Sequence, residues 1–263
     1  MNQRLRFALK FLNYWLFSRH KKGHGIHSPF VFNLVLNVFN NKTPHVDLDK
    51  AFKVYNYYKS SKELLHLNEI GAGSSYKKTK EQTVGNIIRQ SSVNKKYGRL
   101  LYNLAKYFKS DFILEIGTSV GVGTTFIAQA SPTAKFTTLE GLSGKIKVAK
   151  EMSSKLGHKT SFIEGNFDVT LESVLNGYQK LDFVFFDGNH TKESTLKYFE
   201  LCALKSHNES IFIFDDIHWS KEMEEAWEEI KDHKNVSVSV DIFRMGLIFF
   251  KKELSKEHYV IKF

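Results

Sequence analysis

The sequence predicts an α/β fold, with a doubly wound, mostly parallel sheet of seven strands that ends in an antiparallel hairpin, preceded by a mainly helical N-terminal extension. From about residue 97 onward, short apolar runs alternate with longer amphipathic segments, a pattern typical of βαβ units. The last two apolar runs are joined by only three residues, 243–245. A parallel crossover needs a much longer connection, so this final pair is expected to be antiparallel.

The first expected element is an amphipathic helix over residues 3–18. One of its faces carries apolar residues at helical spacing: Leu5, Ala8, Leu9, Leu12 and Leu16. Another face is polar and basic: Arg6, Lys10 and Asn13. A second apolar segment covers residues 30–39, and a Lys- and Tyr-rich stretch follows it to about residue 66.

The α/β region is expected from about residue 97 to the end of the chain. Its predicted strands are Phe112–Ile116, Lys135–Glu140, Thr160–Glu164, Phe183–Asp187, Ile211–Asp215, Val236–Ile242 and Gly246–Phe250. Its predicted helices are Thr124–Ala130, Lys145–Leu156, Lys192–Leu204 and Lys221–His233. We therefore expect two regions, an extension over residues 1–96 and an α/β domain over residues 97–263.

The net charge is unevenly distributed along the chain. The protein has 38 Lys and Arg against 28 Asp and Glu, a formal charge of +10, but the first 100 residues alone carry 18 basic and 5 acidic side chains. A composition with 42% hydrophobic residues excludes a disordered or fibrous chain. The lone Cys202 and the lack of a long apolar run favour a cytoplasmic protein in a reducing compartment.

A glycine-rich turn between the first predicted strand and its helix indicates a nucleotide-type ligand. In the run DFILEIGTSVGVGTTFIAQA, glycines at 117, 121 and 123 let the backbone turn tightly, and the helix opening at Thr124 points amide groups at the same space. The second strand ends at Glu140, where doubly wound folds place the acid that binds a ribose diol. This combination predicts a nucleoside cofactor.

Three carboxylates follow the fourth and fifth predicted strands: Asp187, Asp215 and Asp216. Ligands bind at the carboxyl ends of such strands, so these side chains should converge there. Three neighbouring carboxylates need a cation, and oxygen ligands suit Mg²⁺, Mn²⁺ or Ca²⁺. Helix capping near Ser220 is the alternative for the pair at 215 and 216, and an ordinary turn histidine is the alternative for His190.

These motifs resemble the class I S-adenosylmethionine-dependent methyltransferases, with a Rossmann-like fold, over roughly residues 97–263. The sequence ILEIGTSVGVGTT is similar to the corresponding loop of their small-molecule O-methyltransferase branch. The placement of Asp187, Asp215 and Asp216 resembles the metal-dependent O-methyltransferases of the catechol type. That type has Asn at the position of Asp216. The metal-dependent sugar O-methyltransferases of macrolide biosynthesis are similar to this chain in having two consecutive Asp residues there. The resemblance implies that S-adenosylmethionine contacts these residues: Glu115, Gly117, Thr118, Ser119, Gly121, Gly123, Thr124, Glu140, Gly141, Asn166, Phe167 and Asp187.

The resemblance also implies a catalytic role for His190 and Asp187. His190 stands three residues after the first metal Asp and would act as general base on an acceptor hydroxyl, while Asp187, Asp215 and Asp216 would hold Mg²⁺. The expected reaction is methyl transfer to a hydroxyl of a small molecule. The alternatives are an RNA or protein methyltransferase recruited by the basic extension, and a non-catalytic cofactor-binding protein with a structural or regulatory role.

The extension over residues 1–96 has no assigned chemistry. Relatives use such extensions as a lid or to form a homodimer, and the basic helix over residues 3–18 could instead contact an anionic membrane. Nucleic acid is not an expected partner, because no Arg-rich run or RNA-binding module occurs. The Gly71–Ser74 segment, which imitates a cofactor loop, reads as a plain loop, a lid segment or an anion-contacting turn.

Overall fold

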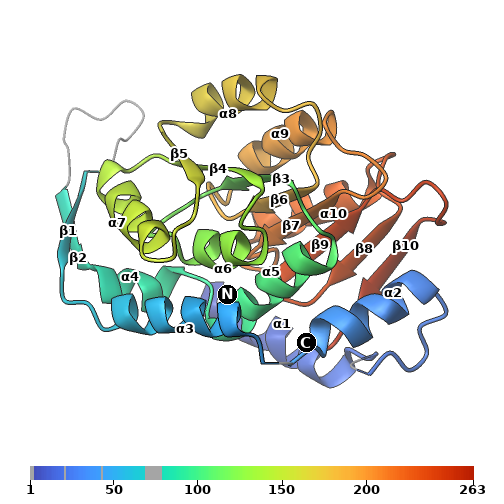
Figure 1. Ribbon diagram of the computed structural model, residues 1–263. Coiled ribbons are helices and arrows are strands. Elements are labelled where there is room, and N and C mark those ends of the chain that lie inside the picture. The colour runs from blue at the N-terminus through green and yellow to red at the C-terminus, as the bar shows by residue number, and fades with distance from the viewer. Residues whose placement is uncertain (1–2, 21, 43, 69–78) are drawn as a thin grey trace. The chain divides into compact units, whose positions relative to one another are not determined.

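The computed structural model describes residues 3–20, 22–42, 44–68 and 79–263 (Figure 1). It has the predicted mixed α/β fold, built on a mostly parallel sheet of eight strands. The chain divides into two compact units, one formed by Lys42–Asn176 and one by Met1–Asn41 with Gly177–Phe263. The functional boundary expected after residue 96 stays a prediction.

The unit Lys42–Asn176 contains three parallel strands in the order β3-β4-β5. They are β3 Phe112–Ile116, β4 Lys135–Glu140 and β5 Thr160–Glu164. Its helices are α3 Val46–Lys59, α4 Val84–Ser91, α5 Lys95–Tyr107, α6 Val122–Ala130, α7 Ser143–Ser154 and α8 Phe167–Asn176. Figure 1 shows α6 and α7 on one side of these strands and α8 on the other, so both faces of the strands are covered.

Close packing between helices supports the strand that carries the cofactor loop. In α5, Gly98 lies so near Phe126 of α6 that an added Cβ would meet the ring at 2.4 Å. The Phe126 ring also packs edge-on against Phe52 of α3, with centroids 5.5 Å apart. The backbone of α5 therefore approaches α6 closely, and the start of α6 is held firmly behind β3.

A small antiparallel sheet in the same unit was not expected from the sequence. Strands β1 Leu64–Asn68 and β2 Thr79–Thr83 pair in register from Leu64 with Thr83 to Asn68 with Thr79. They carry few turn signals and only a weak apolar alternation, which explains why the sequence did not reveal them. The Gly71–Ser74 segment singled out above lies outside the described residues.

The second unit contains five strands in the order β10-β8-β9-β7-β6. They are β6 Phe183–Phe186, β7 Ile211–Asp215, β8 Val238–Asp241, β9 Met245–Phe249 and β10 Glu257–Val260. The predicted antiparallel hairpin is confirmed, because β8 and β9 pair antiparallel from Val238 with Phe249 to Asp241 with Gly246. Strand β10 was not predicted; it runs parallel to β8, so the large sheet has eight strands where the sequence predicted seven.

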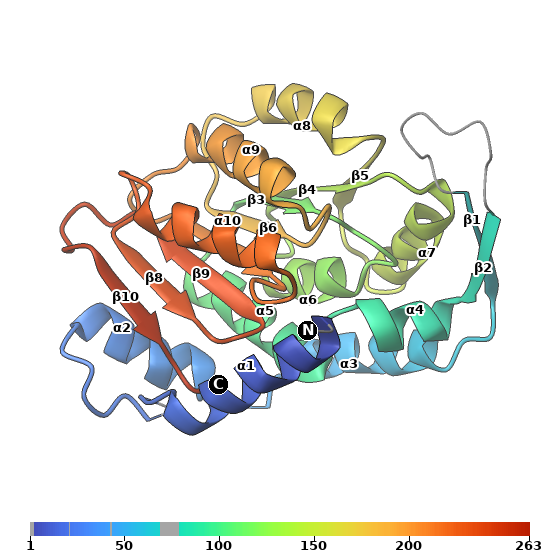
Figure 2. The same cartoon turned by 180° about the vertical axis from the view of Figure 1, so that it is seen from behind.

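Helices cover both faces of these five strands (Figure 2). They are α1 Gln3–Phe17, α2 Pro29–Leu34, the π-helix η1 Val35–Phe39, α9 Lys192–Ala203 and α10 Lys221–Asp232. On one face α9 and α10 pack together and bury Cys202, while on the other Phe30 of α2 meets Phe249 of β9 with centroids 4.9 Å apart. The N-terminal segment is thus part of the same unit as the last strands.

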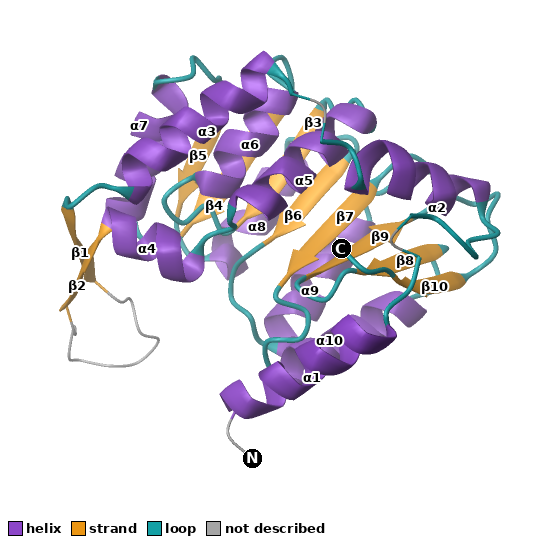
Figure 3. Cartoon of the chain, turned by 90° about the horizontal axis from the view of Figure 1, so that it is seen from below, coloured by secondary structure: helices purple, strands orange, loops and turns teal. Residues whose placement is uncertain are grey.

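The helix α1 lies alongside α10 (Figure 3). Arg6 and Lys10 of α1 both form ion pairs with Glu224 of α10. Within the part of the chain that the structure describes, no helix combines the length and the apolar character needed to cross a bilayer.

Candidate active site

The cofactor loop connects β3 to α6 and depends on two glycines in left-handed conformations. Gly117 has φ +106°, and Gly121 has φ +88° at the N-cap of α6. A Cβ on Gly121 would lie 2.8 Å from Cα and Cβ of Ala149 in α7. Both positions therefore require glycine, for the backbone angle at each and additionally for the approach of α7 at Gly121.

Glu115 is buried at the end of β3 and is satisfied within the protein. Its side chain is 1% exposed and accepts hydrogen bonds from the hydroxyls of Thr124 and Thr138. Burial raises the pKa of Glu115 to about 7, although the two threonine hydrogen bonds act in the opposite direction. Glu115 thus supports the loop from behind, and its predicted contact with the cofactor stays a prediction.

Glu140 ends β4 and holds the cofactor loop through the backbone. Its two carboxylate oxygens accept the amide hydrogens of Ser119 at 2.8 Å and of Leu142 at 3.0 Å. Each oxygen keeps further acceptor capacity, because a carboxylate oxygen accepts more than one hydrogen bond. This arrangement fixes the carboxylate beside the loop, in the position expected for an acid that binds a ribose diol.

The other predicted cofactor residues lie around the ends of the same strands. Thr118 and Thr124 are buried, and the Thr118 amide donates to the Leu139 carbonyl at 2.9 Å. Gly123 is in the first turn of α6, and Gly141 directly follows β4. After β5, Asn166 caps α8 by accepting the Asp168 amide hydrogen at 2.9 Å, and Phe167 begins that helix.

The loop residues fit a bound nucleoside cofactor. Ser119 adopts a left-handed conformation with φ +49°, and its hydroxyl is buried with no hydrogen-bond partner among the described residues. A buried hydroxyl without a partner is costly unless a ligand satisfies it. With Glu140 beside it and the uncapped amide groups of α6 behind it, this hydroxyl indicates a polar ligand at the loop.

In the other unit, Asp187 and His190 follow β6 in a tight turn. His190 Nε2 lies 3.7 Å from Asp187 Oδ1, too far for a hydrogen bond but close enough for electrostatic interaction. Partial burial lowers the pKa of His190; the Asp215 carboxylate opposes this shift and the Arg244 guanidinium adds to it. The imidazole is therefore neutral near pH 7, as a general base requires.

Asp215 at the end of β7 is fully buried and forms a two-pronged ion pair with Arg244. Arg244 Nε donates to Oδ1 at 2.9 Å, and Nη2 donates to Oδ2 at 2.8 Å. Strand β9 runs antiparallel to β7 and places Met245 opposite Asp215, which brings the preceding Arg244 to the same end. The sequence analysis did not identify Arg244.

Asp216 follows directly, in a left-handed conformation with φ +56°. Its Oδ1 lies 3.8 Å from Arg244 Nε. Burial raises the pKa of Asp216 to about 7, the neighbouring Asp215 raises it further, and Arg244 partly offsets both effects. The backbone thus turns Asp216 toward the same guanidinium that holds Asp215.

The predicted Mg²⁺ ligands do not fit a metal ion in this arrangement. Both oxygens of Asp215 are engaged by Arg244, so that carboxylate already has its positive partner. Over the described ranges, no three or more His, Cys, Asp or Glu side chains are grouped in a way that could hold a metal ion. The structure supplies a guanidinium where the sequence led us to expect a cation from solution.

A pocket of about 490 Å³ lies next to this cluster, in the same unit. Its lining combines the candidate base with aromatic and charged side chains: Arg6, Phe7, His190, His218, Trp219, Ser220, Lys221 and Glu222. The volume falls in the range of small-molecule sites. Trp219 is 46% exposed, so it belongs to the pocket wall and not to the core.

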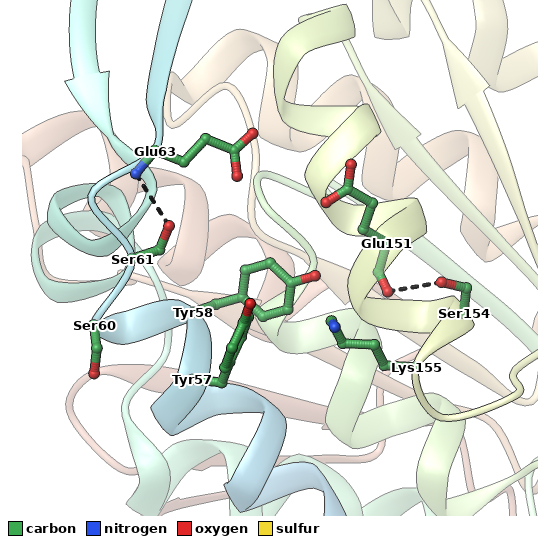
Figure 4. A pocket seen from close by; sticks show the side chains of 8 residues that line it. All are labelled: Tyr57, Tyr58, Ser60, Ser61, Glu63, Glu151, Ser154 and Lys155. Carbon is green, nitrogen blue, oxygen red and sulfur yellow. Dashed lines mark hydrogen bonds between the residues drawn. The ribbon is translucent and has the colours of Figure 1, made fainter.

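A second pocket, of about 570 Å³, lies at the C-terminal end of α7 (Figure 4). In Figure 4 the Lys155 side chain extends toward Tyr57 and Tyr58, and its Nζ lies 4.9 Å from the centre of the Tyr57 ring. The helix begins beside Glu140, and its 12 residues span roughly 18 Å. This pocket is therefore separate from the cofactor loop, and a lysine of the chain already contacts its aromatic rings.

Comparisons with known proteins agree with this fold. Residues 114–217 match a protein family described as a methyltransferase domain. A comparison with curated protein sequences gives no match. The fold of this chain is therefore best compared with solved structures.

Three solved structures illustrate the likeness. The SAH-bound methyltransferase PaMTH1 of Podospora anserina is 14% identical, with a TM-score of 0.61, and covers 86% of this chain and 97% of its own. The O-methyltransferase of Bacillus cereus in complex with SAH is 17% identical, with a TM-score of 0.56, and the match covers 80% of this chain and 93% of that protein. TomG of Streptomyces achromogenes, an O-methyltransferase of tomaymycin synthesis in complex with SAM, is 16% identical, with a TM-score of 0.56. The match covers 95% of this chain and 99% of TomG.

At these identities the likeness shows the fold, which is that of the class I methyltransferases. The family match over residues 114–217 includes the cofactor loop and the strand-end carboxylates Asp187, Asp215 and Asp216. It confirms the resemblance to S-adenosylmethionine-dependent methyltransferases that the sequence indicated.

Proposed function

We propose that this protein transfers a methyl group from S-adenosylmethionine to a hydroxyl group of a small molecule. The observation that carries the proposal is the pocket of about 490 Å³ in whose wall His190 stands. Its imidazole is neutral near pH 7, because burial lowers the pKa. Phe7 and Trp219 supply apolar surface in the same wall, which suits an acceptor with an aromatic or other apolar body.

Bound S-adenosylmethionine supplies an electrophilic methyl group on a sulfonium. His190 accepts the proton of the acceptor hydroxyl while the oxygen forms its bond to the methyl carbon and the carbon–sulfur bond breaks. The electron pair of the broken bond stays on sulfur, and the proton passes from the imidazole to water. Asp187, 3.7 Å from Nε2, stabilises the imidazolium during this step.

Arg244 takes the electrostatic role in this proposal that the resemblance assigned to Mg²⁺. The guanidinium neutralises Asp215 and lies beside Asp216, so the pocket does not require a metal ion to hold its carboxylates together. A chelator distinguishes this proposal from the Mg²⁺ dependence that the sequence led us to expect. The homodimer also remains a prediction, as does the cytoplasmic location.

The test measures SAH release from S-adenosylmethionine with panels of phenols, sugars and hydroxylated lipids, and with RNA and protein pools. We expect turnover with a small hydroxyl compound. His190→Gln should lower kcat by about 10²- to 10⁴-fold while the Kd for S-adenosylmethionine is unchanged. The matched control is His207→Gln, which alters another histidine beside an aspartate, 2.8 Å from Asp182, outside the pocket lining.

The same assay separates the alternatives. Turnover only on RNA or protein would favour a macromolecular acceptor, and cofactor binding without turnover on any pool would favour a non-catalytic protein. Activity should survive excess EDTA in preparations that metal analysis shows to be free of Mg²⁺ and Mn²⁺. Activity that EDTA abolishes and Mg²⁺ restores would contradict the role given to Arg244.

A further inference from the structure

The helix α1 is fixed to its unit through one face. Phe7 and Phe11 each lie with their ring centroids 5.1 Å from that of Phe243, and the Tyr14 ring lies 5.2 Å from it. The Tyr14 hydroxyl donates to the Ile261 carbonyl at 2.6 Å and accepts the Phe263 amide hydrogen at 2.8 Å. These contacts, with the ion pairs to Glu224, define the inner face of the helix.

The opposite face of α1 exposes a row of leucines. Leu5, Leu9, Leu12 and Leu16, here called the leucine stripe, recur every three or four residues and are 50 to 57% exposed. At 1.5 Å per residue the stripe is roughly 16 Å long. Phe17 at the end of the helix is 72% exposed and extends the apolar surface. A continuous apolar row of this kind on a soluble unit indicates a contact surface.

The charged residues of the segment that carries the stripe are all positive. Residues 1–41 contain six Lys and Arg and no Asp or Glu, whereas residues 177–263 of the same unit contain 12 basic and 16 acidic residues. Arg6 and Lys10 turn toward Glu224, while Arg19 and Lys22, just beyond the C-terminal end of α1, are exposed. The partner of this surface should therefore be apolar and negatively charged.

A second copy of the chain fits this surface poorly. In a twofold dimer the same patch would face itself, and the cations of residues 1–41 would find no acidic partner on the facing copy of this segment. An anionic lipid surface supplies both requirements, because acyl chains accept the leucines and phosphate headgroups accept the cations.

We infer that α1 docks this unit on an anionic membrane surface, lying in the interface with the leucine stripe toward the acyl chains. The outer face of α1 would then contact the membrane, while the inner face packs against Phe243. Trp15 supports this orientation. Its side chain is exposed, and Lys262 Nζ lies 4.5 Å from the centre of its ring. An aromatic ring with a neighbouring cation is suited to the headgroup layer of a membrane.

The test is flotation of the full chain with vesicles of phosphatidylcholine, with or without about 30 mol% phosphatidylglycerol. We expect the protein to bind only to the anionic vesicles, and we expect this binding to weaken when NaCl is added to about 0.5 M. Leu12→Glu should weaken binding by about tenfold or more, because it places a charge in the apolar stripe. The matched control is Leu204→Glu, the same exchange at a leucine that is 81% exposed after α9.

A second pair of variants tests the charge. Lys22→Ala should weaken binding to anionic vesicles, and Lys234→Ala, which removes an equally exposed lysine elsewhere in the unit, should not. Circular dichroism confirms that each variant is folded. No binding by the wild type, or equal losses in Leu12→Glu and Leu204→Glu, would overturn the inference. A dimer seen by light scattering and dissolved by Leu12→Glu would assign the stripe to self-association instead.

Discussion

Arg244 and Asp215 form an ion pair in which each residue depends on the other. Asp215 is fully buried, and both of its oxygens are held by the guanidinium. Removal of Arg244 would leave a buried carboxylate without its partner, which is more costly than removal of the whole pair. This asymmetry gives the pair a testable energetic signature.

We therefore predict that Arg244→Gln lowers the free energy of unfolding by about 3 to 5 kcal/mol. The double variant Asp215→Asn with Arg244→Gln should recover part of that loss, because it leaves no unpaired charge. Denaturant unfolding of the wild type, both single variants and the double variant measures the coupling. Additive losses in the double variant would show that the two side chains do not act as a pair.

Glu115 predicts a pH dependence of stability. Burial raises its pKa from 4.5 in the unfolded chain to about 7 in the folded protein, so the folded state binds the proton more tightly. The stabilising effect of this proton is present below pH 4.5 and is lost as the pH rises through 7. The loss amounts to about 3 kcal/mol.

Glu115→Gln should remove this dependence, because the neutral amide can still exchange hydrogen bonds with Thr124 and Thr138. The free energy of unfolding of the variant, relative to the wild type, should rise between pH 5 and pH 8. Glu164→Gln, at an exposed residue on the end of β5, is the control and should show no such rise. Parallel pH curves for Glu115→Gln and the wild type would refute the buried-acid interpretation.

The sequence could predict the acids of the site but not their arginine. Glu140, Asp187 and Asp215 follow apolar strands, and the ends of parallel strands meet at one edge, so their place could be read from the pattern. Arg244 stands in the three-residue link between β8 and β9, and it reaches the end of β7 only because β9 pairs antiparallel with β7. A sequence pattern does not specify which strand a hairpin joins, so the ion pair and the misfit with Mg²⁺ emerged only from the structure.

At the scale of elements, α1 is held to α10 by charge as well as by aromatic packing. Glu224, in the first turn of α10, pairs with both Arg6 and Lys10 and is largely buried by them. Hydrogen bonds to charged groups contribute about 1.5 to 3 kcal/mol each. The attachment of α1 should therefore depend on this one carboxylate.

Glu224→Gln should raise the hydrogen-exchange rates of the α1 amides by about tenfold or more, with little change in β7. The control is Glu228→Gln, one turn further along α10, where the glutamate pairs with Lys231 of the same helix at 2.8 Å. Equal exchange in Glu224→Gln and the wild type would mean that the aromatic contacts with Phe243 suffice to hold the helix.

The elements that the sequence predicted well are those with strong apolar runs or clear caps. The strands from Phe112 to Asp215 and the four helices of the catalytic half agree with the structure to within one or two residues at each end. The strands β1, β2 and β10 were missed, because their composition carries no strong run of β-branched or aromatic residues. Helix α8 was also missed; its first residue, Phe167, is one of the residues expected to contact the cofactor.

At the scale of the whole molecule, the excess positive charge belongs to the two segments that precede the catalytic sequence, but these segments fold into different units. Residues 1–41 join the last strands, and the basic residues after Lys42 join the cofactor-loop unit. The excess positive charge of residues 1–96 is therefore divided between the two units. Tertiary contacts such as Tyr14 with Ile261 decide this, and they connect residues too distant in sequence to be predicted from it.

One helix thus serves both of the interactions proposed for its unit. Its first turns place Arg6 and Phe7 in the wall of the pocket that contains His190, and its outer face carries the leucine stripe. An enzyme with this layout would obey surface-dilution kinetics toward a lipid-soluble acceptor: its rate would follow the mole fraction of that acceptor in the bilayer, while its rate toward a water-soluble acceptor would follow the bulk concentration.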